Sequence, residues 1–167
     1  GATFSQENPL SNVRWDYGRS GNPTRAGLEE TIAKLEGGVA GYAFASGIAA
    51  VNSVLMMFQT GDHVVVGEDI YGGSFRSLTT IFARWGLGVS WVDASDLEQV
   101  EKAVRPETKA ILVETPSNPL LRVCDLRGIA AIAHRHGVLA MIDNTFQTPL
   151  LQRPLELGAD IVIHSAT

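Results

Sequence analysis

Apolar, β-branched segments alternate with helical patterns along the whole sequence, and this alternation restricts the chain to one class of fold. Such segments predict strands at 39–44, 63–67, 88–92, 109–114, 138–143 and 160–164. Their nearly continuous apolar character is typical of parallel strands that are buried on both faces. The sequence therefore predicts an α/β fold, in which helices cover both faces of a mostly parallel sheet.

Helical patterns fill the intervals between these strands. One predicted helix ends at the pair Gly37–Gly38, because glycine commonly terminates a helix. The run 48–58 is apolar on nearly all sides and predicts a helix buried against the sheet. Asp96 and Asp125 are suitable N-cap residues for two further helices.

The composition narrows the classes of function. The 167 residues include 13 Lys and Arg and 18 Asp and Glu, a net charge of −5 with both signs interspersed, so we expect no nucleic-acid partner. No apolar stretch is long enough for a transmembrane helix, so we expect no membrane partner either. The one cysteine, Cys124, is typical of a protein from the reducing cytoplasm. His63, His134 and His136 lack metal-ligand spacing, and we interpret them as solvated or capping residues.

Residues that follow the predicted strands are the candidates for function, because ligands of open α/β sheets bind beyond the carboxyl ends of the strands. After 39–44, the small residues ASGIAA begin a helix, and the backbone N–H groups of Gly47 and Ile48 could bind a phosphate. After 63–67, Tyr71 precedes two glycines, where its ring could stack on a flat ligand and its hydroxyl could transfer protons.

The later strands also end in polar residues. Asn118 lies in a loop between two prolines, where its amide could donate to a ligand oxygen. Asp143 directly follows an apolar strand and could keep a heteroaromatic nitrogen protonated. Ser165 and Thr167 follow the last strand at alternate positions, and their hydroxyls could complete a phosphate site. Each feature also has a simpler interpretation, as a tight turn, a packed ring, a rigid loop or a helix cap.

Taken together, these side chains describe a pyridoxal phosphate site that lacks its lysine. Neither a GxGxxG nor a GxxxxGK[ST] motif is present, which argues against a dinucleotide site or a P-loop. Lys34 and Lys102 lie on predicted helix surfaces and Lys109 begins a strand, so none of them is a credible nucleophile. We therefore expect the cofactor-binding lysine just beyond Thr167.

Several longer motifs resemble the Cys/Met-metabolism family of pyridoxal phosphate enzymes, the trans-sulfuration family. They are YGRSGNPTR (17–25), LEGG (35–38), ASGIAA (45–50), YGGSF (71–75), ETPSNPL (114–120), DNTFQTPLLQRPLELGAD (143–160) and HSAT (164–167). The resemblance implies a fold type I, aspartate-aminotransferase-like large domain. It also implies that HSAT is followed by the Schiff-base lysine, the rest of the large domain and a C-terminal domain. Residues 1–24 would then be an extended segment that contacts a neighbouring subunit, and 25–167 the first part of the large domain.

The resemblance also assigns roles to individual residues. Tyr17 and Arg19 match a pair that reaches the cofactor phosphate of a neighbouring subunit. Tyr71 and Asp143 match catalytic residues, the stacking ring and the partner of the pyridine nitrogen. The remaining cofactor-binding positions are Gly47, Ile48, Asn118, Thr145, Ser165 and Thr167.

The resemblance implies a carbon–sulfur lyase that acts on cystathionine in methionine biosynthesis or cysteine metabolism. It also implies a cytoplasmic homotetramer, built from dimers that share active sites. We expect elimination at the β-carbon, as in cystathionine β-lyases. A γ-replacement transferase, such as cystathionine γ-synthase or O-acylhomoserine sulfhydrylase, and cystathionine γ-lyase are the alternatives. Methionine γ-lyases typically carry a cysteine where this sequence has Gly73. A cofactor-free binding module and an inactive paralogue are the alternatives outside this chemistry.

Overall fold

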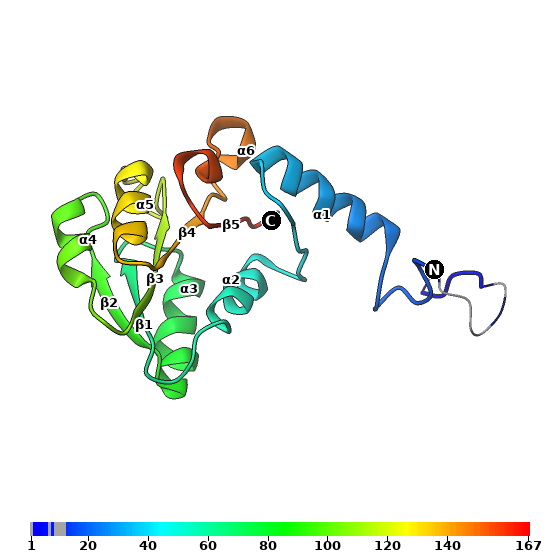
Figure 1. The fold of residues 1–167 in the computed structure, drawn as a ribbon, viewed down its shortest axis with the longest axis horizontal. Helices are drawn as coiled ribbons and strands as arrows, with labels where there is room; N and C mark the ends of the chain where they lie inside the picture. Colours follow the sequence, from blue (N-terminus) through cyan, green and yellow to red (C-terminus); the bar gives the residue numbers. More distant parts are fainter. Residues whose placement is uncertain (1, 7, 9–12) are drawn as a thin grey trace. The chain divides into compact units, whose positions relative to one another are not determined.

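The computed structural model describes residues 2–6, 8 and 13–167, so residues 1, 7 and 9–12 of the predicted N-terminal segment 1–24 lie outside the described part. The chain forms two compact units, Gly1–Ala43 and Phe44–Thr167 (Figure 1). Among the described residues, no helix is long and apolar enough to cross a membrane. In the same part of the chain, no group of three His, Cys, Asp or Glu side chains is placed to hold a metal ion.

In the described part of the N-terminal unit, the regular element is the helix α1 (Pro23–Glu36). The side chain of Asn22 caps it by accepting hydrogen bonds from the N–H groups of Thr24 and Arg25. The helix ends at Gly37, whose φ of 73° is the left-handed conformation that glycine adopts without strain. This end confirms the position predicted from the glycine pair.

The predicted strand at 39–44 is not formed. None of these residues belongs to a strand, and the N–H of Ala43 donates to Oε1 of Glu29 instead of to a neighbouring strand. The side chains of Val39 and Tyr42 are exposed. A strand needs a partner for its backbone groups, and among the described residues this segment has none.

The larger unit is built on a five-stranded parallel sheet in the order β2-β1-β3-β4-β5. The strands are β1 (His63–Gly67), β2 (Gly88–Val92), β3 (Thr108–Glu114), β4 (Leu139–Asp143) and β5 (Ile161–Ile163). Each begins and ends within one residue of its predicted position. These residues form strands because their side chains are apolar on both faces of the sheet.

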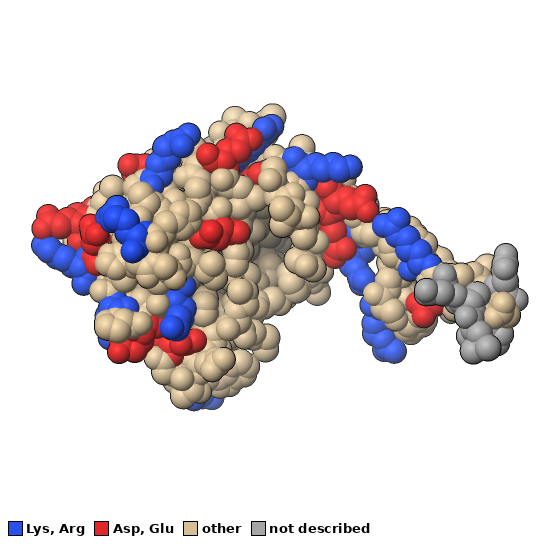
Figure 2. Space-filling model, viewed as in Figure 1, with Lys and Arg blue, Asp and Glu red and all other residues tan. Residues whose placement is uncertain are grey.

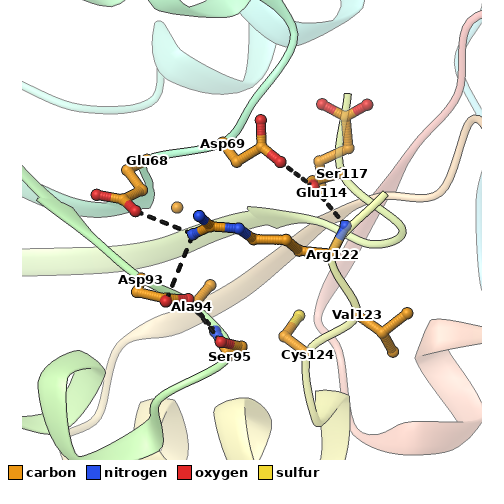
Figure 3. A pocket seen from close by; sticks show the side chains of 11 residues that line it. Glu68, Asp69, Asp93, Ala94, Ser95, Glu114, Ser117, Arg122, Val123 and Cys124 are labelled. Carbon is orange, nitrogen blue, oxygen red and sulfur yellow. Dashed lines mark hydrogen bonds and ion pairs between the residues drawn. The ribbon is translucent and has the colours of Figure 1, made fainter. Parts of the chain in front are cut away.

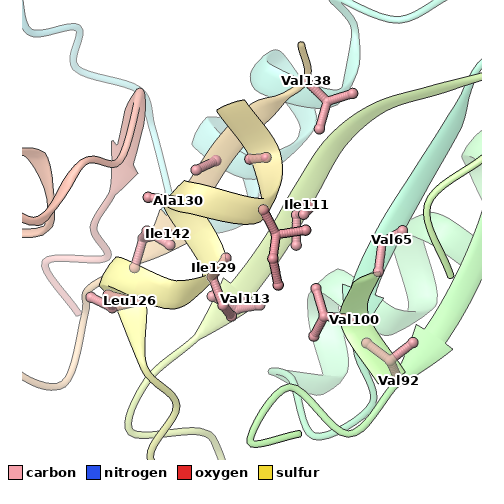
Figure 4. Packing of buried hydrophobic residues seen from close by; sticks show 13 residues of the cluster. Val65, Val92, Val100, Ile111, Val113, Leu126, Ile129, Ala130, Val138 and Ile142 are labelled. Carbon is pink, nitrogen blue, oxygen red and sulfur yellow. The ribbon is translucent and has the colours of Figure 1, made fainter. Parts of the chain in front are cut away.

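Helices cover both faces of the sheet, as predicted (Figure 1). One face packs against α4 (Leu97–Ala103) and α5 (Leu126–Arg135), and Figure 4 shows this core around Val65, Ile111 and Ile142. The other face packs against α2, α3 and the short helices η1 and η2. Their bounds are Gly47–Leu55, Gly72–Arg76, Ser77–Ile81 and Phe82–Trp85, and α6 (Thr148–Leu151) and η3 (Pro154–Leu157) precede β5.

The side chains of successive residues in each strand point alternately into these two cores. This alternation decides to which face the side chain at the end of each strand points. Leu112 of β3 and Met141 of β4 belong to the core beneath α2 and α3. Glu114 and Asp143 come two residues later on the same strands, so they point to that same side.

His63 is buried in the sheet, so its interpretation as a solvated or capping residue is wrong. Its side chain is fully buried, with Nδ1 lying 2.8 Å from Oγ1 of Thr108 and Nε2 lying 3.0 Å from Oγ of Ser90. The ring thus links the start of β1 to the middle of β2 and the start of β3. Burial lowers the pKa of His63, the positive charge of Arg105 lowers it further, and Glu107 partly opposes these effects.

This buried histidine predicts acid sensitivity. Because the pKa is lower in the folded state, the unfolded chain binds the proton more tightly, so stability falls as the pH drops below about 6.5. In the full-length protein, hydrogen exchange of the β1 amides, corrected for intrinsic rates, should therefore speed up in that range. Each unit of pKa difference corresponds to about 1.4 kcal/mol. His63→Gln should flatten the profile, and His136→Gln, at the end of α5, should leave it unchanged; an unchanged profile in His63→Gln would refute this assignment.

Candidate functional site

Two buried acids end neighbouring strands at the carboxyl edge of the sheet. Glu114 of β3 and Asp143 of β4 are partners in the strand register, and they are 6% and 9% exposed. Asp143 is also paired with Ile163 of β5. Since paired residues of parallel strands point to the same side, both carboxyl groups lie on the α2 and α3 side of the sheet.

A chain of hydrogen bonds joins Asp143 to the segment after β5. Oδ1 of Asp143 accepts from the N–H of Thr145 at 3.0 Å and from its hydroxyl at 2.6 Å. Oγ1 of Thr145 in turn accepts from the N–H of Ser165 at 2.9 Å. Oδ2 of Asp143 has no hydrogen-bond partner among the residues that the structure describes. This oxygen is therefore free to bind a donor on a ligand.

Beside Asp143, the start of α2 meets the segment after β5. Gly47 is the first residue of α2, and Ser46 caps it by accepting from the N–H of Ala49. A Cβ on Gly47 would lie 2.6 Å from Cβ of Ser165, so only glycine fits there. The hydroxyls of Ser165 and Thr167 are hydrogen-bonded to each other. A helix N-terminus with free N–H groups and two adjacent hydroxyls is suited to bind a phosphate.

Tyr71 stands at the start of α3 and is held by Glu114. Its backbone N–H donates to Oε2 of Glu114 at 2.7 Å. Its ring, 46% exposed for the residue, lies directly against Gly73, because a Cβ at Gly73 would be 2.3 Å from Cε1 of the ring. The ring can therefore present a face to a ligand while its backbone is anchored to the end of β3.

The loop after β3 is fixed by polar contacts, which Figure 3 shows. The hydroxyl of Ser117 is hydrogen-bonded to Asp69 and accepts from the N–H of Arg122. The guanidinium of Arg122 pairs with Glu68 at 3.0 Å and with Asp93 at 3.4 Å. Together with Gly67, Ala94, Ser95, Glu114, Val123 and Cys124, these residues line a small pocket beyond β1, β2 and β3.

Asn118 follows Ser117 in this loop. Its side chain is half-buried and makes no hydrogen bond with the described residues. On the other side of the loop, the amide of Gln152 donates to the carbonyl of Thr115 at 3.1 Å and to Oδ1 of Asn144 at 2.8 Å. Gln152 thus ties the segment before β5 to the loop that carries Asn118.

The structure brings most of the predicted site residues to one edge of the sheet. Tyr17 and Arg19 belong to the N-terminal unit, where the Arg19 guanidinium lies 5.1 Å from the centroid of the Tyr17 ring, and their role at a site stays a prediction. Lys102 pairs with Glu98 on α4 and Lys109 is an exposed residue near the start of β3. Glu114 was missed by sequence reasoning, which treated it only as part of a motif.

Two independent observations indicate that the residues at this edge of the sheet fit pyridoxal phosphate. Gly47 packs so closely against Ser165 that a Cβ would not fit, which brings the start of α2 next to the Ser165 and Thr167 hydroxyls, a set of donors suited to a phosphate. The buried Asp143 supplies a carboxylate that keeps one oxygen available for the pyridine nitrogen. The charges on the visible face of the larger unit are otherwise of mixed sign (Figure 2).

Fold and geometry together define an α/β protein with a parallel sheet, in which Asp143, Ser165 and the start of α2 come together at the carboxyl edge of the sheet. The profile of the family "Cys/Met metabolism PLP-dependent enzyme" matches residues 1–167. The chain belongs to this family, which confirms the resemblance seen in its motifs.

Comparisons with individual proteins point to the same family. The chain is 52% identical to a cystathionine gamma-lyase of Bacillus subtilis (strain 168) over 99% of its own length and 44% of the relative's. It is 51% identical to a cystathionine beta-lyase of Lactococcus lactis subsp. cremoris (strain MG1363), with the same coverage. A crystal structure of cystathionine gamma-lyase from Lactobacillus plantarum, complexed with L-serine, matches with a TM-score of 0.93 and 49% identity, over 98% of this chain and 43% of that chain. The chain thus spans less than half the length of these relatives.

Proposed function

We propose that the protein is a cytoplasmic, pyridoxal phosphate-dependent enzyme of sulfur amino-acid metabolism that cleaves a carbon–sulfur bond of cystathionine. The observation that carries this proposal is the buried Asp143 beside the cradle formed by Gly47, Ser165 and Thr167. When bound, the cofactor supplies an electron sink for an amino-acid substrate. The chain's own residues hold the cofactor, orient it and keep protons in place.

Each site residue has a task that follows from its position. Asp143 holds the proton on the ring nitrogen, and Thr145 keeps the carboxylate oriented through its two hydrogen bonds. The N–H groups of Gly47 and Ile48 and the hydroxyls of Ser165 and Thr167 bind the phosphate.

Two further side chains act near the ring. Tyr71 covers one face of the cofactor ring, and its hydroxyl can deliver a proton to the departing sulfur. The amide of Asn118 donates to the phenolic oxygen.

The remaining proposals concern the assembly. Residues 1–24 would serve a neighbouring subunit, with Tyr17 and Arg19 at its phosphate, and residues 25–167 would be the first part of the large domain. This arrangement requires at least a dimer, and we propose a homotetramer of such dimers. A dissociated protomer would then bind the cofactor more weakly, because the arginine–phosphate contact would be lost.

Elimination at the β-carbon is the reaction we favour, and the γ-lyase reaction is the second candidate because relatives of both names match at about the same identity. Product analysis with cystathionine separates them. β-Elimination yields pyruvate and homocysteine, whereas γ-elimination yields 2-oxobutanoate and cysteine. If neither keto acid forms and the protein instead makes cystathionine from an acylated homoserine and cysteine, the lyase proposal is wrong and the γ-replacement alternative holds.

Gly73 is predicted to control the position of the Tyr71 ring. In Gly73→Ala the new methyl group would occupy the space of Cε1 of the ring, which must then move away from the cofactor. We expect kcat/KM to fall by about 10²-fold, as is typical for a misplacement of about 1 Å. Gly72→Ala is the matched control, because its Cβ would meet only the flexible end of Arg76 at 3.4 Å. Equal activities of the two variants would contradict this role.

A further inference from the structure

Glu114 stands out because the proposed chemistry does not use it, although it lies at the centre of the site. Its side chain is 6% exposed, and its Oε2 accepts the backbone N–H of Tyr71 at 2.7 Å. It is the register partner of Asp143, so the two carboxyl groups project from adjacent strands to the same side. The Glu114 side chain therefore lies between Asp143, which we assign to the pyridine nitrogen, and Tyr71, which we assign to the face of the cofactor ring.

Among the residues that the structure describes, no basic side chain forms an ion pair with this carboxyl group. The acidic groups around it are Asp143 on β4 and Asp69 in the segment after β1. Arg122 is a cation that lines the adjoining pocket, and Glu68 and Asp93 already hold its guanidinium (Figure 3). The other ionisable groups nearby are the Tyr71 hydroxyl and the Cys124 thiol. A buried carboxylate without a counter-charge is costly unless hydrogen bonds compensate it, and the N–H of Tyr71 supplies such a bond.

We propose that Glu114 is a positioning residue of the cofactor site: its side chain fastens the segment of Tyr71 to the end of β3, beside Asp143, so that the Tyr71 ring meets the cofactor at a fixed place. This role of Glu114 rests on the proposed function in one respect, which is that the ligand is pyridoxal phosphate. The hydrogen bond and the burial belong to the chain itself.

The proton on Glu114 determines how firmly the segment is held. Burial raises the pKa of Glu114 to about 7, the N–H of Tyr71 opposes this, and the charges of Asp143 and Asp69 add to it. When the Tyr71 segment opens, the carboxyl group returns to water and to an ordinary pKa of about 4.3. The closed segment therefore binds the proton more tightly. This stabilisation is complete below about pH 4.3, and it is lost as the pH rises from there through about 7.

Hydrogen exchange of residues 69–73 in the full-length apoprotein tests this directly. After correction for intrinsic rates, protection of the Tyr71 amide should fall by about tenfold as the pH rises through neutrality. Glu114→Gln keeps an acceptor for the N–H but cannot ionise, so its protection should stay high and independent of pH. Glu114→Ala removes the acceptor and should exchange about tenfold faster at every pH. Glu98→Gln, on the exposed surface of α4, is the matched control and should follow the wild type.

A flat profile in the wild type, or the same pH step in Glu114→Gln, would overturn the proposal. If Glu114→Gln fails to fold, the wild-type profile still decides. The holoenzyme gives a second readout, because the visible circular dichroism of the bound cofactor should show the same step and lose it in Glu114→Gln. Since the exchange experiment needs no cofactor, its outcome is independent of whether pyridoxal phosphate binds.

Discussion

Asp143→Asn is expected to lower kcat/KM by about 10³-fold, because removing one charge of a buried pair costs about 3–5 kcal/mol. Asparagine has almost the same shape and can still accept from Thr145. It lacks the negative charge that keeps a ring nitrogen protonated, so the loss should be in kcat rather than in folding. The measurement is steady-state kinetics with cystathionine, together with the absorbance of the bound cofactor.

Asp160→Asn is the matched control for this substitution. Asp160 precedes β5 and accepts from the N–H of Ala140 at 2.8 Å, near the amino end of the sheet. It is an aspartate that supports the sheet without touching the site, so its asparagine variant should retain activity. Wild-type activity in Asp143→Asn would show that the carboxylate only holds the turn at Thr145 and that the ring nitrogen is bound elsewhere.

Gly47→Ala is expected to weaken cofactor binding by about 10²–10⁴-fold, the effect of losing two charge-assisted hydrogen bonds. The new Cβ would lie 2.6 Å from Cβ and 2.7 Å from Oγ of Ser165, so the start of α2 and the segment after β5 must separate. The two halves of the phosphate cradle then no longer face one anion. Equilibrium titration of the apoprotein with pyridoxal phosphate gives the Kd.

The same substitution in α1 controls for the general effect of replacing glycine in a helix. A Cβ on Gly27 meets nothing within 4 Å, so Gly27→Ala should leave the Kd unchanged. It should also stabilise α1 by up to about 1 kcal/mol through helix propensity. If Gly47→Ala binds pyridoxal phosphate as tightly as Gly27→Ala does, the cradle does not hold the phosphate.

The sheet was predictable because each of its strands is buried on both faces, which gives a local pattern of apolar residues. The same reasoning failed at 39–44, where the pattern is similar but the backbone has no partner among the described residues. Strand formation depends on a neighbour that the local sequence does not specify. The apolar run 48–58 likewise forms a shorter helix than predicted, ending at Leu55.

The site was predictable to the extent that its residues directly follow strands. Asp143 and Ser165 could be assigned to one edge because the carboxyl ends of parallel strands must meet there. Glu114 and His63 could not be recognised, because their roles depend on residues distant in sequence. Glu114 is bonded to a residue 43 positions earlier, and His63 to one 45 positions later. The contact between Gly47 and Ser165 also requires the folded sheet.

The most direct test of a pyridoxal phosphate site at this edge is to reduce the full-length protein with borohydride, digest it and locate the pyridoxyl mass. We predict that the mass lies on a lysine directly after Thr167, next to the Ser165 and Thr167 hydroxyls, and not on Lys34, Lys102 or Lys109. A pyridoxyl group on one of those three lysines, or on no peptide at all, would contradict the assignment of this site.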